Sequence, residues 1–98
     1  MQEICIVIGQ TGEYSDKSHW YVAAYINHKS AEELKRAAQR YIDKAPRKVM
    51  DSWTLREEHA KANPFDPQCN IDYTSTTYSI LKLPIKDWAL FKEAQADV

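Results

Sequence analysis

The stretch that decides the fold is Glu3-Ile-Cys-Ile-Val-Ile8, an uninterrupted apolar run that is followed by Gly9. Successive side chains of a strand point to opposite faces, and apolar residues here occupy both sets of positions. The run therefore predicts a central strand over residues 3–9 that is buried on both faces. The other elements are expected to assemble around this strand.

The residues that follow predict an antiparallel partner strand. Residues 10–18 are polar and include Gly12, and their number suits a long hairpin loop. A second strand is predicted over residues 19–27. Strict alternation would place Trp20 and Val22 on one face of this strand and Tyr25 on the other.

A long helix is predicted over residues 31–45. Ser30-Ala-Glu-Glu33 has the form of a capping box, and Pro46 ends the helix. Apolar residues recur at helical spacing along one stripe, namely Leu34, Ala38, Tyr41, Ile42 and Ala45. One side of the helix is therefore expected to face the core.

The rest of the chain predicts a short helix, a strand and a last helix. Residues 47–62 favour a short, partly exposed helix capped by Asp51 or Ser52, and the prolines of Asn63-Pro-Phe-Asp-Pro67 end it. A third strand is predicted over residues 76–83 from its β-branched and aromatic content. Residues 86–95 predict a helix in which Trp88 and Phe91 anchor on the core.

This order of elements predicts one α+β domain over residues 1–98. It consists of a three-stranded, mainly antiparallel sheet with two or three helices packed mainly on one face. If the last strand lies antiparallel to the first, residues 12–16 and residues 63–73 become neighbours at one end of the sheet.

Composition excludes several classes of protein. A net charge of −1 gives no strong field toward nucleic acid or membrane, and 44% hydrophobic residues are typical of a globular chain. The N-terminal apolar run is too short for a secretory signal, and no stretch approaches the roughly 20 apolar residues of a membrane helix. Cys5 and Cys69 are expected to be free thiols in a cytoplasmic protein, with a disulfide as the alternative.

Motifs for metal, cofactor or catalytic chemistry are missing from the sequence. His19, His28 and His59 stand at no ligand spacing with the cysteines, so no metal is expected. Gly9-Gln-Thr-Gly12 follows a strand but lacks the lysine and the helix start of a phosphate loop. We therefore expect a protein that is not an enzyme and binds no cofactor.

The first candidate site combines aromatic and polar residues of the loops. The aromatic content of 11% is high for one small core, so some rings are expected on the surface, where aromatic side chains are enriched in interface hot spots. The residues of this candidate partner-binding site are Tyr14, Asp16, Asn63, Phe65, Asp66 and Tyr73. The alternative is that these residues pin their own loops and cap turns.

The second candidate is a basic face on the long helix. Between Lys35 and Lys48 the sequence holds six basic residues and one acid, Asp43. The residues that recur opposite the apolar stripe are Arg36, Arg40, Lys44 and Arg47. Such a face can meet nucleic acid or an acidic protein surface, or it can be an ordinary solvated helix face.

The chain resembles small accessory proteins encoded in phages and prophages. The residues that carry the resemblance are Thr11-Gly-Glu-Tyr-Ser-Asp16, Trp20, Asn63-Pro-Phe-Asp-Pro67, Asp72-Tyr73-Thr74 and Tyr78. The resemblance implies no defined activity and no catalytic residue. It implies a cytoplasmic protein that binds a host protein, such as a CRISPR effector or another defence complex. A nucleic-acid-binding module and a small-molecule-binding protein are the alternatives.

Overall fold

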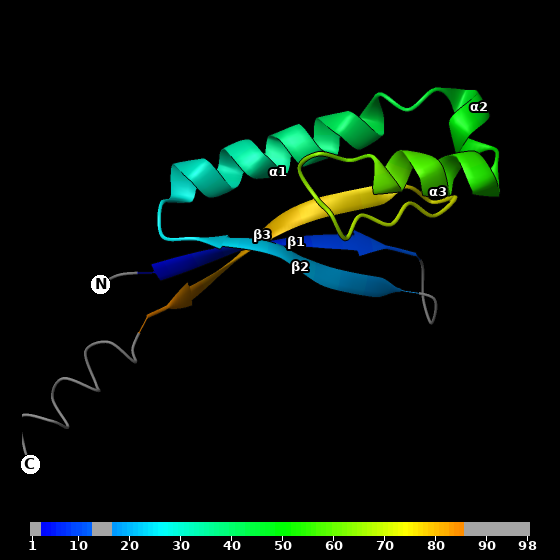
Figure 1. Ribbon diagram of the computed structural model, residues 1–98. Coiled ribbons are helices and arrows are strands. Elements are labelled where there is room, and N and C mark those ends of the chain that lie inside the picture. Colours follow the sequence, from blue (N-terminus) through cyan, green and yellow to red (C-terminus); the bar gives the residue numbers. More distant parts are fainter. Residues whose placement is uncertain (1–2, 13–16, 86–98) are drawn as a thin grey trace, which may run out of the picture.

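A computed structural model describes residues 3–12 and 17–85. The elements are β1 (Glu3–Thr11), β2 (Ser18–Tyr25), α1 (His28–Asp43), α2 (Arg47–Met50), α3 (Trp53–Lys61) and β3 (Thr76–Pro84). The strands form an antiparallel sheet in the order β2-β1-β3, and the helices lie on one of its faces (Figure 1). The predicted α+β fold with β1 at the centre is confirmed. The helix predicted over residues 86–95, with Trp88 and Phe91, lies outside the described residues.

The strand predicted to stop at Gly9 continues to Thr11. Gly9 is needed inside the strand because the indole of its cross-strand partner Trp20 lies directly against it. A Cβ at position 9 would lie 2.5 Å from Trp20 Cε2. The glycine therefore makes room for a large ring on the face of the sheet that carries the helices.

A bulge in β2 changes the predicted faces of that strand. Val7 pairs with Ala23 and Ile8 pairs with Tyr21, so Val22 is the extra residue. Trp20 pairs with Gly9 and Tyr25 with Cys5, which places both aromatic residues on the helix side of the sheet. The expectation of opposite faces for Trp20 and Tyr25 was wrong, because one inserted residue reverses the alternation.

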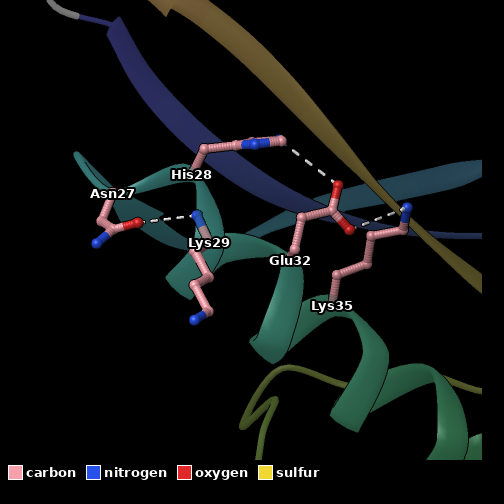
Figure 2. Close-up of polar contacts among 5 residues, drawn as sticks. All are labelled: Asn27, His28, Lys29, Glu32 and Lys35. Atoms are coloured by element: carbon pink, nitrogen blue, oxygen red, sulfur yellow. Dashed lines mark hydrogen bonds and ion pairs between the residues drawn. The ribbon is translucent and has the colours of Figure 1, made fainter.

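Helix α1 begins earlier than predicted. Asn27, and not Ser30, is the N-cap: its Oδ1 accepts from the backbone N–H of Lys29 at 2.9 Å (Figure 2). Glu32 lies 3.5 Å from the ring of His28 and 4.0 Å from Lys35 Nζ, also shown in Figure 2. Asparagine caps helices as well as serine does, and the end of β2 at Tyr25 brings Asn27 to that position first.

The core lies between α1 and the sheet. Ala31, Ala38 and Ile42 of α1 are buried against Cys5 and Val7 of β1. Leu34 and Tyr41 are half-buried and pack against this cluster, so the predicted apolar stripe is confirmed from Leu34 to Ile42. Ala45 lies beyond the end of α1 at Asp43. Among the described residues, the helices cover one face of the sheet, and the expected burial of β1 is seen on that face.

The predicted short helix is α3, and Ser52 caps it by accepting from the backbone N–H of Leu55. Its end is fixed to α1 by Tyr41, whose hydroxyl donates to the carbonyl of His59 at 2.8 Å. The Tyr41 and His59 rings stack with centroids 4.3 Å apart. As a result α3 lies beside the end of α1, near the place where β1 ends and β2 begins (Figure 1).

Candidate functional site

The carboxylate of Asp66 lies at the centre of a buried hydrogen-bond network. Its Oδ2 accepts from Trp20 Nε1 at 2.9 Å and from the Tyr78 hydroxyl at 2.7 Å. Its Oδ1 accepts from the backbone N–H of Gln68 at 3.0 Å. The loop after α3 is therefore tied to β2 and β3 through one acidic side chain.

Asn63 and Asp66 serve the fold, which corrects their expected place on a partner-binding surface. Both side chains are buried. Asn63 Oδ1 accepts from the backbone N–H of Phe65 at 2.9 Å, and its Nδ2 is buried without a hydrogen-bond partner among the described residues. The alternative considered from the sequence, that such residues fix their own turns, holds at these two positions.

The segment that contains Tyr73 lies at the end of β1. Thr11 Oγ1 donates to the carbonyl of Ser75 at 2.7 Å and accepts from the backbone N–H of Asp72 at 3.2 Å. Residues 12–16 were predicted to lie beside residues 63–73. The structure places Asp72 against Thr11, directly before that loop, whereas residues 13–16 lie outside the described residues. Tyr14 and Asp16 lie outside the described residues.

A cleft of about 240 Å³ opens at this end of the molecule. We call it the end cleft, and its lining includes Thr11, Trp53, Arg56, Glu57, Asn70, Ile71 and Asp72. Thr11 and Ile71 are buried, whereas Trp53 is 77% exposed. The lining of the end cleft therefore combines buried side chains with the exposed indole of Trp53.

Exposed aromatic side chains stand next to this cleft and in the loop before it. Tyr73, which directly follows the cleft residue Asp72, is 70% exposed, and Phe65 is 40% exposed. Of the predicted partner-binding residues, the structure therefore leaves Phe65 and Tyr73 accessible. Trp53 was not among the predicted site residues, because no motif marks an apolar residue at the start of a short helix as a binding residue.

The basic residues of the second candidate site are exposed as predicted: Arg36, Arg40, Lys44 and Arg47. Arg47 lies 3.7 Å from Asp51 of the same helical turn, and both side chains are exposed. A shallow depression runs along α1 between Lys35 and Asp43.

Gln39, which lies within this basic face, has a structural role. Its Nε2 donates to the carbonyl of Thr76 at 2.8 Å, and its Oε1 accepts from the backbone N–H of Tyr78 at 2.9 Å. The amide therefore occupies the backbone groups that β3 would offer to another strand. This contact blocks the first part of the outer edge of β3.

Cys69 lies against the same network, with its sulfur 3.5 Å from the Tyr78 hydroxyl. Burial raises the pKa of the Cys69 thiol above its ordinary value of 9.0, and the Asp66 carboxylate adds to this effect. Burial, followed by hydrogen bonds with Cys69 and Asp66, also raises the pKa of the Tyr78 hydroxyl. Both groups are therefore held in their neutral forms.

These shifts predict a loss of stability in alkali. The unfolded thiol loses its proton near pH 9 while the folded thiol retains it, so the free energy of unfolding falls as the pH rises above that value. Urea denaturation from about pH 8 to about pH 10 should show a steeper loss for the wild type than for Cys69→Ala. Parallel losses in the two proteins would refute a role for this thiol.

Within residues 3–12 and 17–85, no group of three or more His, Cys, Asp or Glu side chains could hold a metal ion. None of the helices in that part of the chain is long and apolar enough to cross a bilayer. Comparison with protein-family models, with curated proteins and with solved structures gives no match for this chain.

Proposed function

We propose that the protein acts by binding another protein through the end cleft and the exposed aromatic rings beside it. The observation that carries the proposal is the exposure of Trp53 at a cleft whose lining includes buried residues. Tryptophan and tyrosine, together with arginine, are enriched among the residues that dominate binding energy at protein interfaces. Trp53 and Tyr73 together offer two such rings at one end of the molecule.

The size of the end cleft favours a protein partner over a small molecule. Its volume is about 240 Å³, whereas ligand pockets are commonly about 300–1,000 Å³ and bury most of the ligand. A single side chain of a partner protein fits such a cleft while the rings around it make the remaining contacts. The lining also contains one positively charged residue, Arg56, and two negatively charged residues, Glu57 and Asp72.

The class of partner is proposed from the sequence resemblance. Phage accessory proteins implied by that resemblance act on host proteins, and we propose a host defence complex, such as a CRISPR effector, as the partner. The protein would then inhibit or modulate that complex by occupying one of its surfaces. No catalytic step by this chain is part of the proposal.

Removal of either exposed ring should weaken partner binding strongly and leave the fold intact. Trp53→Ala and Tyr73→Ala should each weaken binding by about 2 kcal/mol or more, which is about 30-fold in Kd. Because both side chains are exposed, the free energy of unfolding should change by less than about 0.5 kcal/mol. The measurement is affinity capture from a bacterial lysate, followed by titration of the captured complex with each variant.

The matched control is the double change Arg36→Glu and Arg40→Glu on the basic face. It should leave the captured partner bound. If it abolishes capture while Trp53→Ala is silent, the interface lies on α1 and the proposal is wrong. A steep fall of DNA or RNA affinity with salt, removed by this double change, would identify a nucleic-acid-binding module.

A further inference from the structure

The face of the sheet opposite the helices carries large apolar side chains that no described residue covers. We call it the open face. Ile4, Ile6 and Ile8 of β1 are half-buried there, and Leu81 and Leu83 of β3 are 40% and 44% exposed. Figure 1 shows that α1, α2 and α3 all lie on the other side of the strands.

The open face is not uniformly apolar along its length. At the end where β1 begins, Ile4 pairs with Leu83, and the next pair on this face is Ile6 with Leu81. Toward the end of β1 the pairs on this face become mixed and then polar. In these later pairs with β3, Ile8 faces Ser79 and Gln10 faces Thr77. On the β2 side of the same face, Ile8 pairs with Tyr21, which is 60% exposed. The aliphatic pairs of the open face are therefore concentrated in the half nearest the start of β1 and the end of β3.

The chain itself supplies an apolar segment at that half. Pro84 pairs with Glu3 at the start of β1, so residues 86–98 begin beside the apolar pairs and not at the polar end. Their sequence is Lys-Asp-Trp-Ala-Leu-Phe-Lys-Glu-Ala-Gln-Ala-Asp-Val. Trp88, Phe91, Ala94 and Val98 recur at intervals of three or four, the spacing of one helical face. Leu90 stands four positions before Ala94 and belongs to the same side.

The length of residues 88–98 as a helix matches the length of the apolar half of the open face. A helix of the length from Trp88 to Val98 would extend about 16 Å, against about 30 Å for a strand of the length of β1. It would therefore cover about half of the open face. Two copies packed through this face would each bury roughly 400 Å² of a sheet about 14 Å wide. Their total of roughly 800 Å² is below the 1,200 Å² or more of stable interfaces.

We propose that residues 86–98 dock on the apolar half of the open face through Trp88, Leu90 and Phe91. The segment then forms a second layer on the sheet, opposite α1. Because it follows β3 directly, docking is intramolecular and has no cost of bringing two molecules together. The polar half of the face, at Gln10 and Thr77, stays open.

Methyl-labelled NMR of the full chain tests the proposal directly. The Trp88 ring should show nuclear Overhauser contacts to methyl groups of Ile6 and Leu81. The double change Trp88→Ala and Phe91→Ala should remove these contacts and increase the fluorescence of an added apolar dye several-fold. The control change Lys86→Ala and Lys92→Ala, in the same segment, should leave dye fluorescence at the wild-type level.

Two results would overturn the proposal. Contacts between Ile6 or Leu81 and a differently labelled second molecule would show that another copy covers the face. Strong dye binding by the wild type, unchanged in the double variant and without contacts from Trp88, would show that the open face is uncovered in the free protein. Both outcomes are independent of the end cleft and leave the proposed function in place.

Discussion

Asp66→Ala should lower the free energy of unfolding by about 2–6 kcal/mol, as measured by urea denaturation. The change removes the carboxylate that accepts from Trp20 Nε1 and from the Tyr78 hydroxyl, and leaves the hydroxyl only the longer contact with Cys69 Sγ at 3.5 Å. Each buried donor that loses its partner costs about 1–3 kcal/mol, and two are affected. Such a loss is a large part of the total stability of a small domain.

The matched control for this prediction is Asp43→Ala. Asp43 is an exposed carboxylate on α1 that accepts from Gln39 Nε2 at 3.2 Å. Its removal should change stability by less than about 0.5 kcal/mol. Equal small effects at both positions would show that the buried network does not hold the loop after α3 in place.

Ile42→Ala should destabilise the protein by about 2–5 kcal/mol, the usual range for removing a large aliphatic side chain from a core. Ile42 is 2% exposed and lies between α1 and the sheet, so its loss leaves a cavity that the surrounding strands cannot fill. Leu34→Ala, at a half-buried position of the same helix, should cost less. Thermal or urea denaturation of the two variants measures the difference, and near-neutral values for both would refute the assigned core face of α1.

The architecture could be predicted because each strand and helix carries its own local pattern. The isoleucine-rich run over residues 3–8 correctly predicted the central strand. The spacing of Leu34, Ala38 and Ile42 correctly predicted the side of α1 that faces the core. The errors arose where a contact distant in sequence changes a local preference. Gly9 weakens a strand by propensity, yet it is retained inside β1 because Trp20 needs the space.

The candidate site was harder to predict for the same reason. An aspartate between prolines in Asn63-Pro-Phe-Asp-Pro67 is typical of an exposed turn. Asp66 is buried because Trp20, 46 residues earlier, and Tyr78, 12 residues later, both donate to it. No local sequence pattern predicts such a hydrogen-bond network. The sequence shows that Trp20 and Tyr78 lie on predicted strands and carry hydrogen-bond donors. Only the folded structure shows that both donors point to one place, where Asp66 accepts from them.

The central place of β1 in the sheet affects the chain while it is being synthesised. One edge of β1 pairs with the nearby β2, but the other pairs with β3, whose last residue is Pro84. A ribosome that adds about 5–20 residues per second needs roughly 4–15 s to proceed from Thr11 to Pro84. During that time an isoleucine-rich strand emerges with one edge unsatisfied, which makes the nascent chain prone to aggregation. The finished protein is protected from this hazard only after its last strand has been made.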